Sequence, residues 1–133
     1  MLDQPYLLKP YHGIRWLRNP GKNRFPFIEH ELAPMYGVHQ AIAVDVDGDG
    51  KLDIVAVSFL PANGFPQRQE KKLDALILLE QTSPGKFVRH TLESVTCDHV
   101  SLAAGDVTGS GRPDLVVGAY GARAGSPPVT IWK

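Results

Sequence analysis

The stretch that decides the fold reads Asp45-Val46-Asp47-Gly48-Asp49-Gly50-Lys51-Leu52-Asp53. Aspartates stand at loop positions one, three, five and nine, and glycine stands at position six, where a sharp turn favours φ > 0. Alternate positions of a tightly turned loop can all point inward, and Ca²⁺ prefers carboxylate and carbonyl oxygens. The pattern therefore predicts a cation loop, to which Lys51 contributes its backbone carbonyl while its side chain points to solvent. A metal-free acidic turn is the alternative.

The residues on either side of this loop are typical of strands. Residues 41–44 read Ala-Ile-Ala-Val, and residues 54–59 read Ile-Val-Ala-Val-Ser-Phe. An EF-hand needs flanking helices and a Glu at loop position twelve, which is Ala56 here. A dockerin-type loop needs a following helix, and no helical periodicity follows. The loop is therefore predicted to connect two strands as a hairpin.

The same unit occurs a second time. Residues 106–114 read Asp-Val-Thr-Gly-Ser-Gly-Arg-Pro-Asp and lead into another apolar run, Leu-Val-Val-Gly-Ala-Tyr. Upstream of each loop, residues 27–32 align with residues 87–92, and a third strand-like segment recurs at 14–17, 77–80 and 129–132. Internal repeats of this length are typical of solenoids and propellers. Each unit reads as four short strands, which is one propeller blade.

These residues resemble a known family. Residues 44–55 are similar to the FG-GAP/VCBS-type repeat of integrin-α-like β-propellers, and residues 104–118 are a degenerate copy. The resemblance implies that Ca²⁺ is the cofactor, bound by the side chains of Asp45, Asp47, Asp49 and Asp53 and by the carbonyl of Lys51. In the second loop neutral hydroxyls replace two carboxylates. It is either a weaker calcium site or an empty turn held by local hydrogen bonds, and the candidate residues are Asp106, Thr108, Ser110, Arg112 and Asp114.

We therefore expect an all-β fold of about two four-stranded antiparallel blades plus one extra N-terminal strand. Residues 1–24 are predicted to hold the last strand of a preceding blade, residues 25–85 the first blade with the intact loop, and residues 86–133 the second blade. Propellers typically have four to eight blades, and two blades leave apolar faces that need neighbours. The chain is expected to be part of a larger propeller, or to complete one by association of several copies. The third alternative is an open two-blade domain whose faces are covered by loops.

The charge balance of the chain bears on the kinds of partner it can bind. The chain has 14 basic and 14 acidic residues and no net charge, so nothing favours nucleic acid or an anionic membrane. No apolar run approaches the ~20 residues that span a bilayer, and residues 1–10 show no signal-peptide pattern. The family resemblance nevertheless favours an extracytoplasmic location, where calcium is abundant. Cys97 is the single cysteine, and it is expected to be a small, half-buried hydrophobe.

Two further sets of residues have a structural and a functional interpretation. His39 and His99 precede the two loops at similar positions, which favours a repeated packing role; on strands lining a central channel they could instead bind metal or act as general acid–base groups. Equivalent aromatic residues are expected to pack between blades, while Tyr36 lies outside the repeat and is the better candidate for an exposed contact. The aromatic residues in equivalent positions are Trp16, Trp132, Phe59 and Tyr120.

The function predicted from the sequence is a non-catalytic, calcium-binding propeller module that recognises a protein or a carbohydrate. The alternative is the scaffold of a propeller enzyme that acts on carbohydrate as a lyase or dehydratase. An enzyme would need ionisable groups that converge in the central channel or on one rim. Only the histidines offer such groups, and no nucleophile elbow, P-loop or HExxH motif is present.

Overall fold

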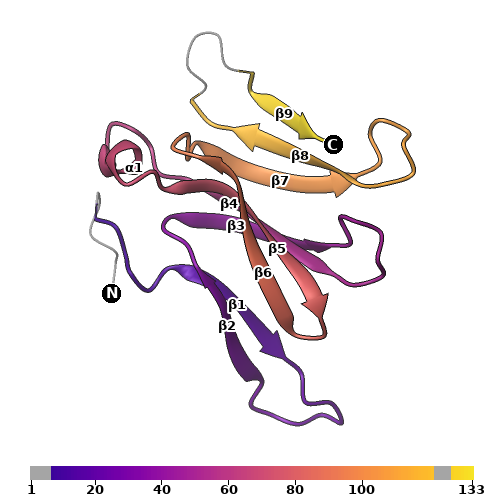
Figure 1. Ribbon diagram of the computed structural model, residues 1–133. Coiled ribbons are helices and arrows are strands. Elements are labelled where there is room, and N and C mark those ends of the chain that lie inside the picture. Colours follow the sequence, from indigo (N-terminus) through magenta and orange to yellow (C-terminus); the bar gives the residue numbers. More distant parts are fainter. Residues whose placement is uncertain (1–6, 122–126) are drawn as a thin grey trace.

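A computed structural model describes residues 7–121 and 127–133. Over these residues the chain is all-β, with antiparallel strands and one helix of a single turn (Figure 1). No helix in this part of the chain is long and apolar enough to cross a membrane. The elements are β1 (Gly13–Arg18), β2 (Ile28–Pro34), β3 (Val38–Val44), β4 (Asp53–Ser58), α1 (Gln67–Glu70), β5 (Asp74–Ser83), β6 (Lys86–Ser94), β7 (His99–Gly105), β8 (Asp114–Ala119) and β9 (Val129–Trp132).

The strands form three successive antiparallel sheets. The first is the hairpin β1–β2, the second is the four-stranded sheet β3–β4–β5–β6, and the third is the three-stranded sheet β7–β8–β9. Each sheet consists of strands that are neighbours in the sequence, which is how the blades of a propeller are built. The prediction of an all-β fold made of propeller-type blades is confirmed.

The division of the strands among the blades differs from the prediction. The predicted boundaries at 24/25 and 85/86 fall inside the hairpins β1–β2 and β5–β6. β6 was expected to open the second blade, but it pairs with β5 along almost its whole length, from Asp74 opposite Ser94 to Ser83 opposite Lys86. The tight turn at Pro84 and Gly85, with Gly85 at φ 74°, leaves no room for a crossover between sheets. The sheets therefore change between β2 and β3 and between β6 and β7.

Two apolar layers hold the three sheets together. The side chains of β4 alternate, so that Ala56 faces the β1–β2 hairpin while Val55 and Val57 face the third sheet. The first layer consists of Ile14, Ala33, Met35, Ala56, Ile77 and Leu79, and the second of Val55, Val57, Leu76, Leu102, Leu115 and Val117. Because β4 is buried on both faces, it reads as a continuous apolar run rather than as an alternating one.

The insertion between β4 and β5 is more ordered than a solvated loop. It contains α1, whose Arg68 is buried, and it covers a third apolar cluster of Leu60, Leu73, Ala75 and Cys97. Cys97 is fully buried, and this burial raises the pKa of its thiol. The structure therefore places Cys97 as a buried hydrophobe, deeper than the half-buried position that the sequence suggested.

The strand register separates the two histidines that the sequence analysis grouped. Val38 pairs with Ser58 in the second sheet, and His99 pairs with Ala119 at the corresponding place in the third. His99 is thus equivalent to Val38, and His39 is displaced from it by one residue. Since a shift of one residue turns a side chain to the opposite face, His39 is exposed whereas His99 is buried. A shared packing role for these two residues is ruled out.

Candidate metal centre

The loop between β3 and β4 is shaped by its first aspartate. One carboxylate oxygen of Asp45 accepts hydrogen bonds from the amides of Gly48 and Asp49, at 2.8 and 3.1 Å, and the other accepts one from Gly50 at 2.9 Å. Gly48 and Gly50 adopt φ of 79° and 86°, a conformation that disfavours any residue with a Cβ. Asp45 therefore closes the turn from inside.

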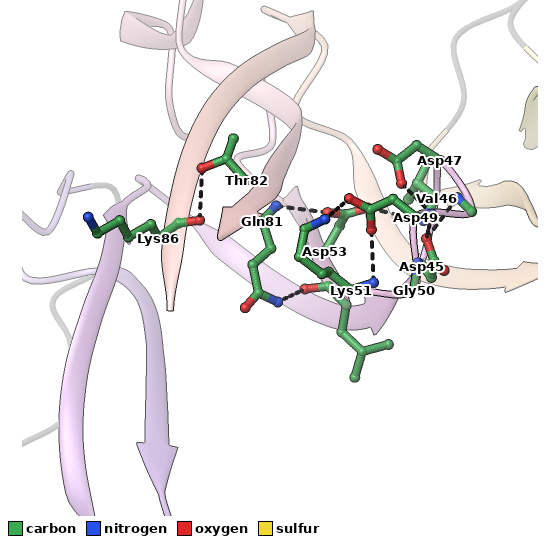
Figure 2. Close-up of polar contacts among 12 residues, drawn as sticks. Asp45, Val46, Asp47, Asp49, Gly50, Lys51, Asp53, Gln81, Thr82 and Lys86 are labelled. Carbon is green, nitrogen blue, oxygen red and sulfur yellow. Dashed lines mark hydrogen bonds and ion pairs between the residues drawn. The ribbon is translucent and has the colours of Figure 1, made fainter. Parts of the chain in front are cut away.

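The ninth residue of the loop anchors it to the sheet. Asp53 is only 2% exposed. Its Oδ2 accepts a hydrogen bond from the amide of Val46 at 3.1 Å, and its Oδ1 accepts one from the amide of Gln81 in β5 at 2.8 Å. Asp53 thus joins the two ends of the loop to each other and to the next strand, as Figure 2 shows.

The exposed side of the loop carries a carboxylate cluster. One carboxylate oxygen from each of Asp45, Asp47 and Asp49 lies within 4.8 Å of the other two. Oxygen donors from closely spaced acidic side chains are the ligands that hard cations such as Ca²⁺ take, so the donor set fits the ion that the family resemblance implies. The structure brings three of the four predicted carboxylates together, and the fourth, that of Asp53, instead receives backbone amides.

Lys51 does not lie as the sequence suggested. Its side chain folds back, and its ammonium group forms an ion pair with Oδ2 of Asp49, while its amide donates to Oδ1 of the same residue at 2.8 Å (Figure 2). The hydrogen bond from the Lys51 side chain is the main reason why the pKa of Asp49 is lowered, and the same bond raises the pKa of Lys51. The negative charge of the nearby carboxylates attracts this ammonium group, so the Lys51 side chain does not point to solvent as expected.

The second loop repeats the backbone of the first. Asp106 accepts amide hydrogen bonds from Ser110 at 2.8 Å and Gly111 at 2.9 Å, and Asp114 accepts one from Val107 at 3.0 Å. These bonds correspond one by one to bonds made by Asp45 and Asp53 in the first loop. The first and ninth aspartates are therefore what the turn itself requires in both copies.

The middle positions are where the two loops differ. The hydroxyl of Thr108 donates to Asp114 at 2.9 Å, and Ser110 is hydrogen-bonded with the backbone of Arg112, accepting from its amide at 3.3 Å. The pKa of Asp114 is lowered mainly by the hydrogen bond from the amide of Thr108. Hydrogen bonds from the Thr108 hydroxyl and the Val107 amide add to the effect. In the described part of the chain a metal-type cluster of His, Cys, Asp and Glu is found at the first loop and not at the second.

Gln81 supports the first loop, and the sequence analysis did not identify it. Besides its amide bond to Asp53, its side chain donates to the carbonyl of Leu52 at 2.6 Å and accepts from the amide of Gly85 at 3.0 Å. Gln81 therefore links the acidic loop to the β5–β6 turn. A glutamine in a strand carries no motif, and only the pairing of β4 with β5 brings it to the loop.

The histidines considered as candidate acid–base groups lie at the ends of the strands away from the acidic loops. Nε2 of His99 is 3.2 Å from a carboxylate oxygen of Glu93, and both ring nitrogens of His99 are buried without a hydrogen bond of good geometry to the described residues. Contact with His99 is the main reason why the pKa of Glu93 is lowered, and Thr96 adds to the effect. His39, by contrast, has its ring against Phe59, with ring centroids 6.0 Å apart.

Sheets of this kind, joined in sequence and carrying an aspartate-rich β-hairpin loop, define a propeller-type repeat protein. Residues 6–56 match the model of the family described as the FG-GAP-like repeat, which supports an FG-GAP-type repeat in this part of the chain. The match runs from the N-terminal hairpin through the intact loop into β4. The second unit lies outside it and is identified by its equivalent hydrogen bonds. Neither the curated proteins nor the solved structures gave a match.

Proposed function

We propose that the protein is a calcium-binding propeller module whose ion sits on the loop between β3 and β4. The observation that carries this proposal is the convergence of carboxylate oxygens of Asp45, Asp47 and Asp49 within 4.8 Å of one another. They lie on a turn that Asp53 anchors to the sheet. Three carboxylates at this distance repel one another, and a divalent cation removes that repulsion. Asp53, whose oxygens also accept the amides of Val46 and Gln81, and the Lys51 carbonyl complete the proposed ligand set.

The neighbouring ion pair supports a role for a cation here. Without a metal, the ammonium group of Lys51 supplies positive charge to Asp49. Calcium supplies two charges to the whole cluster, and Lys51 is then free to leave it. The ion stabilises the hairpin by mass action, by about 2.7 kcal/mol when its concentration is 100 times the dissociation constant.

The second loop serves as a turn that does not need metal. Asp106 and Asp114 make the bonds that shape it, and Thr108 and Ser110 direct their hydroxyls to other groups of the same loop. The calcium dissociation constant rises by orders of magnitude as the number of anionic ligands in a loop falls. We therefore assign one site of useful affinity to the described part of the chain.

The module is non-catalytic and presents a surface to a protein or carbohydrate partner outside the cytoplasm, where calcium is plentiful enough to fill a loop of moderate affinity. A catalytic His–Glu pair would need a ring nitrogen that substrate can reach. Of the two His–Glu pairs in the described residues, His99 with Glu93 has both ring nitrogens buried. His90 with Glu80, 2.7 Å apart, lies on the exposed surface of the neighbouring strands β5 and β6. The binding role is therefore preferred to the lyase or dehydratase alternative.

The test compares Asp49→Ala with Ser110→Ala, which changes the equivalent position of the second loop. Isothermal titration with CaCl₂ should give one site in the wild type and in Ser110→Ala, and at least a tenfold weaker site in Asp49→Ala. Thermal unfolding should show Asp49→Ala destabilised in calcium and nearly unchanged in EGTA. Equal destabilisation in both buffers, or no calcium binding by the wild type, would reject the proposal.

A further inference from the structure

The strand ends opposite the acidic loops carry a row of aromatic rings. β4 and β8 begin at the loops and end beside Phe59 and Tyr120, on the side where α1 lies in Figure 1. The two positions are equivalent, since the amide of Phe59 donates to Gly37 and the amide of Tyr120 donates to Asp98, each at 2.9 Å. Each sheet thus contributes one ring to the same side of the molecule.

The rings contact one another across the junction between the second and third sheets. Phe59 and Tyr120 meet edge to face, with centroids 6.0 Å apart and planes at 82°, and His39 meets Phe59 at the same centroid distance. Tyr120 is 68% exposed. Tyr120 thus contacts the neighbouring sheet, as expected, but is not buried there, and an edge-to-face contact leaves at least one face of its ring available to a ligand.

A fixed ion pair lies beneath the row. Arg68 of α1 is 4% exposed, and its Nη1 donates to Oδ1 of Asp98 at 2.6 Å and to the carbonyl of Leu60 at 2.8 Å. A buried guanidinium needs such partners to offset its lost hydration. The second oxygen of Asp98 makes no hydrogen bond to the described residues, so it is available as an acceptor in a fixed position.

These groups line one groove. Phe59, Tyr120, Arg68 and Asp98 border a space of about 520 Å³, with the exposed amide side chain of Asn63 along its edge. This volume lies in the range of small-molecule sites, which combine apolar or aromatic walls with a few placed polar groups. Because Arg68 and Asp98 neutralise each other, the groove has no net charge to select an ionic ligand.

We propose that this groove binds a neutral oligosaccharide. A pyranose ring offers an apolar C–H face that stacks on an aromatic face, and its hydroxyls both donate and accept, which suits Tyr120, Asp98 and Asn63 together. Rings contributed by successive sheets can contact successive sugar units. The proposal rests on the function proposed above in that the module is a binding surface, but its residues are separate from the acidic loops.

The strand arrangement disfavours an extended peptide as the occupant. A peptide that binds by strand addition needs a free sheet edge. β4 lies between β3 and β5, and β8 lies between β7 and β9, so the strands that end at the groove are both paired on their two sides. The ligand must therefore be held by side chains.

The experiment probes an array of neutral and acidic oligosaccharides with the full chain in CaCl₂ and measures each positive sugar by titration calorimetry. Tyr120→Ala should weaken binding at least tenfold, as removal of an aromatic anchor does, and Asn63→Ala should weaken it several-fold. Tyr120→Phe keeps the ring and loses only the hydroxyl, so it should weaken binding less than Tyr120→Ala does. Phe25→Ala removes a ring that is 80% exposed on the β1–β2 connection and should change nothing.

The outcomes separate this site from the calcium loop. Binding of neutral sugars that Tyr120→Ala weakens supports the groove, whether or not calcium binds. The groove proposal is overturned if the protein binds no neutral sugar on the array, or if Tyr120→Ala leaves sugar binding intact. Either result counts even if the CaCl₂ titration shows a calcium site. Selective binding of acidic glycans overturns the choice of a neutral sugar. Sugar binding by a protein that fails to bind calcium rejects only the calcium proposal.

Discussion

The side-chain amide of Gln40 in β3 pairs with the backbone of Leu102 in β7, the first strand of the neighbouring sheet. Its Nε2 donates to the Leu102 carbonyl at 3.0 Å, and its Oε1 accepts from the Leu102 amide at 2.8 Å. The side chain thus completes both backbone groups of Leu102 as a neighbouring strand would. It joins two sheets that are otherwise held by the apolar layer of Leu102 and its contacts.

Replacing Gln40 should therefore destabilise the junction between the second and third sheets. Gln40→Ala leaves two partly buried backbone groups of Leu102 unpaired, and each unsatisfied group costs about 1–3 kcal/mol. We expect a lower urea midpoint with little change in slope. Gln69→Ala, an exposed glutamine of α1, is the control. A loss no larger than that of the control would show that water replaces the side chain without cost.

The connection between β2 and β3 depends on a glycine. Gly37 has φ of 64°, and a Cβ added there would clash with Cγ of the buried Leu60. Gly37→Ala should lower stability by about 1–3 kcal/mol, because it adds backbone strain to a clash in the core. Gly105→Ala is the matched control, since it meets nothing within 4 Å and has no positive φ. Equal melting temperatures for the two variants would contradict the argument.

Lys51 is expected to compete with the cation for Asp49. Lys51→Gln keeps the backbone carbonyl, removes the ammonium group that pairs with Asp49, and should strengthen calcium binding about two- to fivefold, in line with the modest value of exposed ion pairs. Lys86→Gln removes the same charge from the nearby β5–β6 turn and is the control for long-range electrostatics. A gain of equal size in both variants would mean that net charge, and not competition at Asp49, sets the affinity.

The second loop should become a calcium site when its carboxylates are restored. The backbone bonds of Asp106 and Asp114 already match those of Asp45 and Asp53, so the double variant Thr108→Asp, Ser110→Asp needs no new fold. Titration with CaCl₂ should then give two sites instead of one. A stoichiometry that stays at one, in a variant that unfolds cooperatively, would show that the carboxylate pattern alone does not make the site.

The sequence predicted what depends on local pattern. The aspartate spacing, Gly50 and the apolar runs around the loop specify a strand–loop–strand unit, and the second copy specifies a repeat. These features are readable because turn chemistry and strand periodicity act over a few residues. The FG-GAP-type repeat matched at residues 6–56, the all-β class and the position of the acidic cluster followed from them.

What the sequence could not give depends on which strands pair. The alignment of residues 27–32 with 87–92 located equivalent strands correctly but not the sheet to which each belongs, because a repeat can be divided at any of its connections. The roles of Gln40 and Gln81 depend on register between distant strands, which no local pattern encodes. The Lys51 side chain adopts a rotamer that brings its ammonium group to Asp49, and the charge of the nearby carboxylates, rather than a sequence pattern, determines that rotamer.

The contact between β6 and β7 predicts how stability depends on pH. The pKa of Glu93 is lowered in the folded chain, chiefly by His99, so the unfolded chain binds a proton more readily. A carboxyl with a depressed pKa stabilises the fold above its unfolded value and loses that contribution as pH falls. We expect melting temperatures in EGTA to decline as pH drops below about 4.5, the ordinary value for this group.

Glu93→Gln should remove part of that decline and lower stability near neutral pH, because the variant has no carboxylate to contact His99. Arg68 and Asp98 line the same pocket as Glu93 and His99, and both remain in the variant, so the difference between the two pH profiles belongs to the pair. Glu31→Gln, on the exposed face of β2, should keep the wild-type profile. Parallel profiles for wild type and Glu93→Gln would show that this carboxylate is equally protonated in the folded and unfolded chains.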